Sequence, residues 1–303
     1  MNLALKIQDV RRSSGLSQGK FASKLFVTRQ AVSRWETGET TPTIDTLKNM
    51  FEFFNVNPSH FFEVLPICQS CSMPLQNPED LGQNLDKSVN LDYCKYCFVD
   101  GTLEKASSIE EIIEYSIAAM KEHNYFTEEF TEADERAHLI KTLPTLKRWK
   151  RVATINRAKE FIKNRCVNGG TVGGDAFCTI SLIDLDGYPT AATITPASSD
   201  GGIETIWFGT SLDSNKVRRI KKKPKACICF NSGEVNISLV GDIEIVSDLE
   251  TKKEVLYEEI AEMPYYPQGI KDPNLIALKF ITKRFDIWFG DTESWEKGKA
   301  NDL

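Results

Sequence analysis

The stretch IWFGTSLDSNKVRRIKKKPKACICF, from Ile206 to Phe230, places a strand, a short helix and a second strand in close succession. IWFGT is rich in β-branched and aromatic residues, which favours a strand. SNKVRRIKKK has the spacing of a helix that Pro224 ends, and KACICF returns to strand-like alternation. Seven of the ten residues from Lys216 to Lys225 are basic, although the chain's formal net charge is −6. The stretch therefore indicates a sheet with an inserted basic helix.

The segments on both sides continue this pattern. CTISLIDLDGYPTAATITP predicts two strands joined at Asp186-Gly187, a strong hairpin signal. EVNISLVGDIEIV and NLIALKFITKRFDIWFG predict two more strands, with the helical DLETKKEVLYEEIAEM between them. About six strands without long βαβ alternation favour a closed antiparallel barrel. We place this barrel at residues 153–290 and expect residues 291–303 to form a frayed tail.

The order of these segments resembles the pyridoxamine 5′-phosphate oxidase-like split barrel, in its general-stress-protein branch. The resemblance implies a homodimer with flavin mononucleotide (FMN) in two equivalent clefts between the barrels. It implies a phosphate cradle, to which the helix starting near Asp213 adds backbone amides. The cradle residues implied are Thr210, Ser211, Ser214 and Lys216, and the residues lining the flavin ring are Thr193, Ile194 and Thr195.

Alternatives remain for this barrel. The basic stretch could be a phosphate cradle, a solvated helix whose end favours cations, or a second DNA contact. Flavin-binding members often carry Arg or Lys on the strand that here reads TAATITP, which offers only threonines. The ligand could then be haem, a deazaflavin or another small metabolite. We assign no catalytic residue, because the three histidines, His60, His123 and His138, lie outside the barrel.

Eight cysteines fall into two groups. Two CxxC pairs separated by 22 residues predict a tetrahedral zinc site, formed by Cys68, Cys71, Cys94 and Cys97. A closed Cys₄ shell leaves no position for water, so this zinc would be structural. An iron–sulfur cluster and a thiol redox switch are the alternatives. For Cys178, Cys227 and Cys229 on the predicted strands, we expect buried apolar cysteines, with redox sensing as the alternative.

The segment CQSCSMPLQ…DYCKYCFVDG resembles a zinc-ribbon family found in bacterial regulators and small cytosolic proteins. We place the ribbon at residues 66–104 and a helical linker at residues 105–152. Charge is uneven here: Asp100 to Glu135 holds 11 acids and 2 bases, and Arg136 to Arg165 holds 10 bases and 1 acid. These blocks are either two solvated helical faces or partners across a domain or dimer boundary.

Residues 1–65 have the pattern of several short helices with a tight turn between the second and third. LSQGKFA, VTRQAVSRWETGETTP and NVNPSHFF resemble the Cro/repressor-type helix-turn-helix family, whose third helix enters the major groove of DNA. Arginine suits guanine, glutamine suits adenine, and the start of the second helix suits a phosphate. The expected DNA-binding residues are Gln18, Thr28, Arg29, Gln30, Ser33 and Arg34.

The chain is thus predicted to be a multidomain α+β protein. It combines an all-α helix-turn-helix head, a small zinc ribbon with a helical linker, and an antiparallel split β-barrel. With no signal-peptide pattern and no run of about 18 apolar residues, we expect a cytoplasmic protein without a membrane partner. The predicted function is a one-component transcriptional regulator, most simply a repressor, that binds an operator in double-stranded DNA and a small-molecule ligand. The alternative functions are a flavin-dependent oxidoreductase tethered to DNA and a structural DNA-bridging protein.

Overall fold

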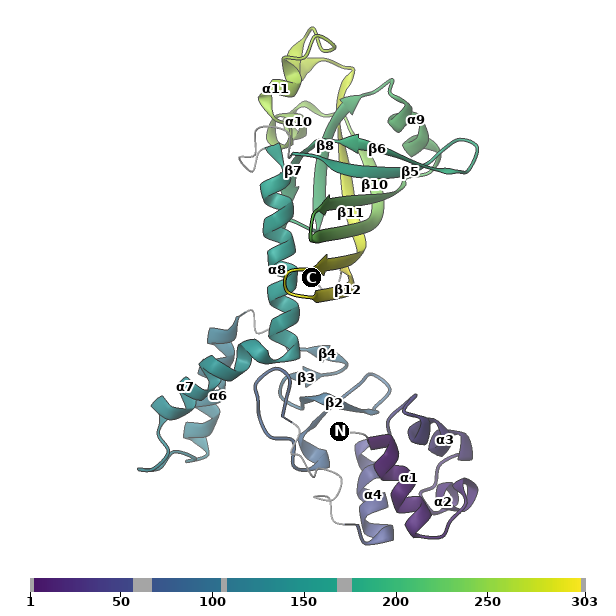
Figure 1. Ribbon diagram of the computed structural model, residues 1–303, viewed down its shortest axis with the longest axis vertical. Coiled ribbons are helices and arrows are strands. Elements are labelled where there is room, and N and C mark those ends of the chain that lie inside the picture. The colour runs from purple at the N-terminus through teal and green to yellow at the C-terminus, as the bar shows by residue number, and fades with distance from the viewer. Residues whose placement is uncertain (1–2, 57–66, 105–107, 168–175, 301–303) are drawn as a thin grey trace. The chain divides into compact units, whose positions relative to one another are not determined.

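The computed structural model describes residues 3–56, 67–104, 108–167 and 176–300. The chain divides into two compact units, Met1–Lys150 and Arg151–Leu303 (Figure 1). The two units have separate apolar cores.

The first unit begins with four short helices. They are α1 (Leu3–Ser13), α2 (Gln18–Lys24), α3 (Arg29–Thr37) and α4 (Ile44–Phe54). Ser17, Thr28 and Thr43 are the N-caps of α2, α3 and α4, and each side chain accepts a hydrogen bond from a backbone N–H in the first helical turn. The helix expected at NPSHFF lies outside the described residues.

A cysteine-containing β region follows. It comprises η1 (Pro78–Asp80), β1 (Leu81–Gln83), β2 (Val89–Cys94), β3 (Phe98–Val99) and β4 (Thr102–Leu103). β1 pairs with β2 and β3 pairs with β4, both antiparallel. Such short strands have little stability of their own. They share one apolar cluster with the helical head, in which Leu47 and Met50 of α4 lie with Leu75, Leu81 and Val89.

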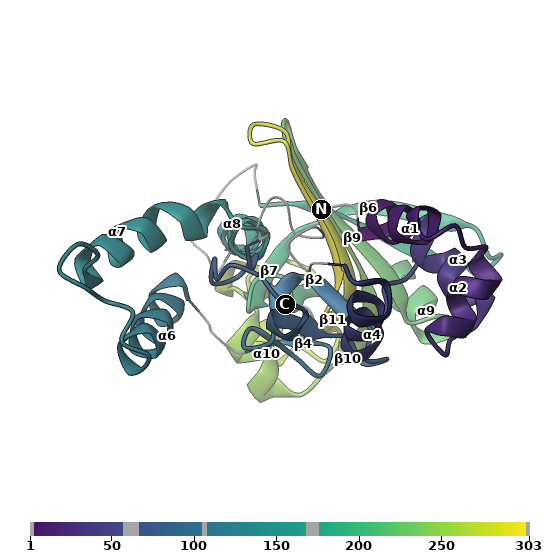
Figure 2. The same ribbon diagram turned by 90° about the horizontal axis from the view of Figure 1, so that it is seen from below.

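Three further helices complete this part of the chain: α6 (Ile109–Glu122), α7 (Glu132–Thr142) and, after the short η2 (Leu143–Thr145), α8 (Lys147–Arg165). α6 and α7 lie side by side in Figures 1 and 2. Arg136 of α7 forms ion pairs with Glu114 at 2.6 Å and Glu132 at 3.0 Å. Acidic and basic blocks therefore meet here within one helical hairpin.

The second unit is an antiparallel sheet that curls on itself. Its strands are β5 (Cys178–Ile183), β6 (Pro189–Ile194), β7 (Pro196–Asp200), β8 (Thr205–Ser211), β9 (Lys225–Ser232), β10 (Val235–Val246), β11 (Leu275–Phe289) and β12 (Ser294–Lys299). The order is β6-β5-β9-β10-β11-β8-β7, with β12 also paired to β11. The two end strands, β6 and β7, are consecutive in the chain with only Thr195 between them. The sheet must therefore curl until its ends approach each other at Thr195.

Helices close this sheet on more than one side. α9 (Asn215–Lys222) buries Val217 and Ile220 in the main core, where Ile155 and Ile162 of α8 also lie. The other helices are α10 (Leu249–Val255), α11 (Glu258–Ala261) and η4 (Gly269–Lys271), which belong to a second cluster around Trp207. In the described part of the chain, no helix has the length and apolar character needed to cross a membrane.

The expectation of a frayed tail is wrong for β12. Trp295 pairs in register with Trp288, and the Trp295 indole donates a hydrogen bond to Asp286. Lys297 forms an ion pair with the same carboxylate at 3.0 Å. These cross-strand contacts make β12 a regular strand, and sequence alternation alone did not reveal it because the segment is short and polar.

Candidate functional site

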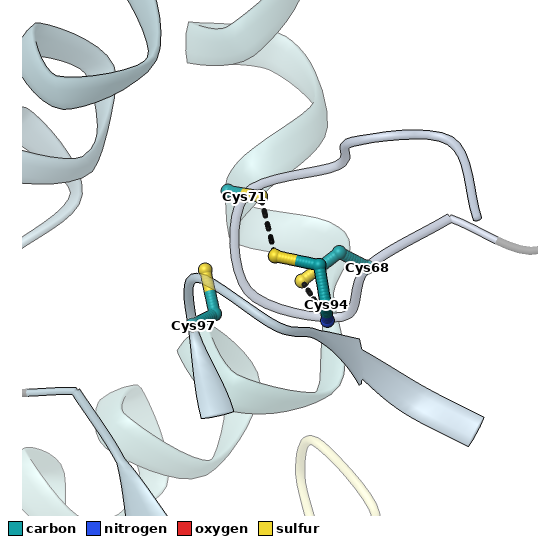
Figure 3. A group of neighbouring side chains, drawn as sticks. All are labelled: Cys68, Cys71, Cys94 and Cys97. Atoms are coloured by element: carbon teal, nitrogen blue, oxygen red, sulfur yellow. Dashed lines mark hydrogen bonds between the residues drawn. The ribbon is translucent and has the colours of Figure 1, made fainter. Parts of the chain in front are cut away.

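The four cysteines of the two CxxC pairs lie together in the first unit (Figure 3). Their Sγ atoms all lie within 4.8 Å of one another, and those of Cys71 and Cys94 are 3.8 Å apart. Zn–S bonds of about 2.3 Å in a tetrahedron place sulfur atoms about 3.8 Å apart. Cys68 and Cys94 are fully buried and Cys97 is 5% exposed. The donor set, spacing and burial fit a closed four-thiolate metal site.

The thiols influence one another's ionisation. Hydrogen bonds from the other thiols, Cys71 first, lower the pKa of Cys68. The same network, through Cys68 first, raises the pKa of Cys71 and of Cys97, because ionising them would bring like charges together. A bound divalent cation removes this conflict by balancing several thiolates at once.

The first turn of α8 holds the first CxxC loop. Buried Arg148 donates to Ser70 Oγ at 2.8 Å and to the Glu104 carbonyl at 2.8 Å, and the Trp149 indole donates to the Ser70 carbonyl at 2.8 Å. The backbone N–H of Arg148 also donates to the Gln69 carbonyl at 3.2 Å. Sequence reasoning missed this support because nothing in the pattern KRWK identifies a partner 78 residues away.

The expected DNA-binding side chains lie mainly on one open side of the helical head. Val32 and Trp35 of α3 are buried. Arg29, Gln30 and Arg34 are exposed, and Ser33 is half-buried. Thr28 is exposed and its hydroxyl accepts a hydrogen bond from the Ala31 N–H at 3.1 Å. One face of α3 therefore packs in the core of the head, and the opposite face is open to solvent.

Gln18 has a partner that the sequence did not suggest. Its amide donates to Glu36 at 2.9 Å, and Arg11 binds the same carboxylate through Nε and, at 3.1 Å, through Nη2. Burial alone would raise the pKa of Glu36, but the hydrogen bonds from Arg11 and Gln18 outweigh it and lower the pKa. This network ties α1, α2 and α3 together.

In the barrel, three expected cradle residues have partners of their own. The Thr210 hydroxyl is buried and donates to Ser214 Oγ at 3.4 Å, while Ser214 caps α9 by accepting from the Val217 N–H. Ser211 Oγ lies 3.0 Å from the hydroxyl of Tyr266. These hydroxyls therefore stabilise the turn before α9.

Lys216 has a different environment. It lines a shallow hollow whose other lining residues are Ile180, Leu182, Thr190, Ala191, Ala192 and Arg219. The expected ring-lining residues follow on the same strand: Thr193 is exposed, Ile194 is buried, and Thr195 is half-buried at the junction of β6 and β7. The structure thus places Lys216 in one hollow with residues 190–192 of β6, directly before the expected ring-lining residues.

Several residues of the basic stretch have structural partners. Arg219 forms an ion pair with Asp184 at 2.8 Å, and Lys222 donates to the Leu185 carbonyl at 2.6 Å. Both contacts hold the turn between β5 and β6. Lys225 forms an ion pair with Asp242 of β10. Arg219, Lys222 and Lys225 therefore stabilise the sheet through these contacts.

The cysteines of the barrel do not form a second cluster of this kind in the described residues. Cys166 and Cys178 are buried in the main core, and burial raises the pKa of Cys166 to about 11. Cys227 and Cys229 are half-buried and contact Ser238 and Asn236.

Comparisons with known families match three successive stretches of the chain. The family described as "Helix-turn-helix" matches residues 7–61. "Putative zinc ribbon domain" matches residues 67–150, which include the Arg148 and Trp149 contacts. "Pyridoxamine 5′-phosphate oxidase like" matches residues 193–298.

Among individual proteins, the HTH-type transcriptional activator BcrR of Enterococcus faecalis is 39% identical over 51 residues, which is 17% of this chain and 25% of that protein. A general stress protein 26-related structure from Clostridium acetobutylicum is 24% identical, with a TM-score of 0.39, covering 48% of this chain and 97% of that one. An FMN-binding, pyridoxamine 5′-phosphate oxidase-related protein from Nostoc punctiforme is 14% identical, with a TM-score of 0.33. The match covers 49% of this chain and 93% of that one.

The three family matches agree with the helical head, the four-cysteine region and the curled sheet. The chain therefore combines a helix-turn-helix domain, a zinc ribbon domain with a four-cysteine cluster, and a pyridoxamine 5′-phosphate oxidase-like barrel.

Proposed function

We propose that this protein is a one-component transcriptional regulator. Its helix-turn-helix head would read an operator in double-stranded DNA, and its barrel would dimerise and bind a small ligand. The observation that carries the proposal is the geometry of α3, where Val32 and Trp35 are buried while Arg29, Gln30 and Arg34 project to solvent.

The DNA contact follows from this geometry. A helix with one buried face can enter the major groove, where Arg pairs with guanine and Gln pairs with adenine. Thr28, Ser33 and the first turn of α2 at Gln18 are placed to contact phosphates or base edges beside it. The side chain of Gln18 already binds Glu36, so the group that we propose for a phosphate contact is its backbone N–H at the start of α2.

Selection of duplexes from a random pool tests this part of the proposal. The full chain should enrich one sequence with two related half-sites, because a dimer presents two α3 helices. Recovery of random sequences after repeated rounds would overturn the assignment of α3 as a sequence-reading helix.

For the metal, we propose zinc held by Cys68, Cys71, Cys94 and Cys97. The ion would act as a structural centre, because four thiolates complete a tetrahedral shell. The buried sulfur atoms and the shortness of the ribbon's strands support this role. Metal analysis of the purified chain should give one zinc per chain, whereas iron with inorganic sulfide would contradict the proposal.

For the dimer, we propose the outer face of the sheet as the contact surface. Two rows of paired residues cross neighbouring strands there: Thr193, Thr179, Cys229 and Ser238, and beside them Ala191, Ser181, Cys227 and Val240. All eight are exposed or half-buried. A surface made mainly of small side chains lets a second sheet approach closely.

A bulky charge on this face tests the dimer. Ser181→Arg should convert a dimeric chain to a monomer in sedimentation measurements, whereas Lys221→Glu on α9 should not. A chain that is monomeric before any substitution would contradict the proposed dimer.

For the ligand, we propose a small molecule with an anionic group near Lys216 and the start of α9. FMN is one candidate, and haem or another metabolite is another. The hydroxyls of Thr210, Ser211 and Ser214 already have partners within the chain, so the proposal rests on the charge of Lys216 and not on these hydroxyls. An absorbance spectrum separates these cases: flavin bands, a Soret band, or a colourless protein.

The flavin-dependent oxidoreductase is the second candidate, supported by the family match over residues 193–298. It differs from the sensor in turnover. Oxidation of a reduced pyridine nucleotide by the purified chain would favour the enzyme, and ligand-dependent operator affinity without turnover would favour the sensor.

A further inference from the structure

We infer that the metal site of the ribbon positions the recognition helix α3 on DNA, so that filling this site controls operator affinity without any contact between metal and DNA. The inference rests on the proposed DNA-binding function of α3. It concerns the loop that follows α3 and its contacts with the ribbon.

The loop between α3 and α4 pairs with the ribbon. Thr41 Oγ1 donates to the Val89 carbonyl at 2.8 Å, and the Val89 N–H donates to the Pro42 carbonyl at 2.9 Å. Thr43 forms an isolated antiparallel bridge with Ser88. Residues 41–43 thus lie along the start of β2 like a short additional strand.

The other end of β2 belongs to the metal site. β2 runs from Val89 to Cys94, and the Cys94 N–H donates to Cys68 Sγ at 3.3 Å. β1 covers only three residues, and the register between β1 and β2 shifts between Leu81 and Gly82. Because so short a ladder holds β2 only weakly, we expect ligation of Cys94 to the metal to help fix the position of β2.

Apolar contacts also connect α4 to the ribbon. Leu47, Met50 and Phe51 of α4 share one buried cluster with Val89 and Cys94 of the ribbon. On its surface, Lys48 of α4 forms an ion pair with Glu79 at 3.0 Å. A ribbon that lost its metal would therefore release both the loop after α3 and the face of α4 that packs on it.

A second set of contacts links the first three helices of the head to one another. Arg11, Gln18 and Glu36 join α1, α2 and α3 on the side that does not involve the ribbon. We therefore expect metal removal to loosen α4 and the loop that follows α3, while α1, α2 and α3 stay packed on one another. The consequence is a graded loss of DNA affinity.

Hydrogen exchange in the full chain, without DNA, tests the coupling directly. The N–H groups of Val89, Thr46 and Leu47 are bonded to Pro42, Thr43 Oγ1 and the Thr43 carbonyl, respectively. Removing zinc with a chelator under reducing conditions should speed exchange at all three. Unchanged protection at Thr46 and Leu47 in zinc-free protein would overturn the inference.

DNA binding provides the second readout, with the duplex enriched by the zinc-loaded chain as the probe. Zinc removal should weaken binding by between about fivefold and about 150-fold, the usual range for coupling between two sites. Thr41→Val, which removes one loop contact and no ligand, should weaken binding of zinc-loaded protein by about twofold to about tenfold. The matched control is Thr40→Val, an exposed neighbour in the same loop, which should bind as wild type.

The outcomes separate the two ideas. If Thr41→Val and Thr40→Val bind equally, or if zinc-free and zinc-loaded protein bind equally, the coupling is wrong although DNA binding stands. If no duplex is enriched at all, the proposed function is wrong, and the exchange measurement still decides whether the metal positions α4.

Discussion

The ribbon and the barrel each contain four of the eight cysteines, yet they use them in opposite ways. In the ribbon, the sulfur atoms lie within 4.8 Å of one another. In the barrel, two cysteines lie in the apolar core and two on the outer face of β9. A region with strands of two to six residues gains stability from metal ligation, whereas a region with a full core needs cysteine only as a small apolar side chain.

The cores show the same contrast. Phe208, Phe230, Phe280 and Phe289 are fully buried inside the curled sheet. The ribbon has no buried aromatic side chain among its described residues and shares its few apolar ones with the head. The barrel can therefore stabilise itself, and the ribbon depends on the metal and on the head.

The largest expected effect comes from removing one ligand. Cys94→Ser should lose zinc and the cooperative unfolding of the ribbon, because structural zinc contributes an apparent binding free energy of about 10–16 kcal/mol. Cys227→Ser on the barrel is the control and should keep one zinc and an unchanged unfolding midpoint. Metal analysis and thermal unfolding measure both variants. If Cys94→Ser and Cys227→Ser gave the same zinc content and unfolding midpoint, the proposed difference between ribbon and barrel cysteines would be wrong.

The second-largest expected effect comes from the core of the barrel, which does not depend on a metal. Phe280→Ala should lower the free energy of unfolding of the barrel by about 3–5 kcal/mol, because it leaves a cavity in a closed core. Zinc content should not change. A loss of zinc in this variant, measured on folded protein, would mean that the two regions are not independent in stability.

A smaller effect should come from the support of the metal site. Arg148→Met removes the hydrogen bonds to Ser70 and Glu104 while keeping an apolar side chain on Trp149. The affinity for zinc should fall by about 10–100-fold, as is typical when partners of metal ligands are lost. Competition with a coloured chelator measures this, and an unchanged affinity would show that α8 does not stabilise the CxxC loop.

The smallest of these effects depends on pH. Because the pKa of Glu36 is lowered in the folded head, its ionised form stabilises the head at neutral pH, and this stabilisation is lost as the pH falls through the lowered pKa. Glu36→Gln should cost about 1–2 kcal/mol at neutral pH and flatten the acid side of the stability curve. A variant with the same acid dependence as wild type would show that other carboxylates dominate it.

The sequence predicted the three kinds of domain because each leaves a local pattern. The caps Ser17 and Thr28, the cysteine spacing and the alternation around Ile206 all act over a few residues. The contacts between distant segments could not be predicted in this way. Arg148 with Ser70, Thr41 with Val89 and the pairing of β12 with β11 depend on tertiary packing that no local pattern records.

The site was predicted unevenly for the same reason. Cysteine spacing specifies a metal site almost by itself, and the structure places all four thiols together. The cradle residues Thr210, Ser211 and Ser214 have the right chemistry for an anion, but their hydroxyls bind neighbours. Hydroxyl groups serve capping and turn formation as readily as ligand binding, so their sequence pattern is ambiguous.

The most direct test of the account is the operator affinity of zinc-loaded full chain carrying Arg29→Ala or Arg34→Ala. Each should weaken binding to the selected duplex by about 1–3 kcal/mol and relax base preference at one position. Arg218→Ala on α9 is the matched control and should bind as wild type. If both α3 variants bound the selected duplex with wild-type affinity and base preference, the central claim that α3 reads DNA would be contradicted.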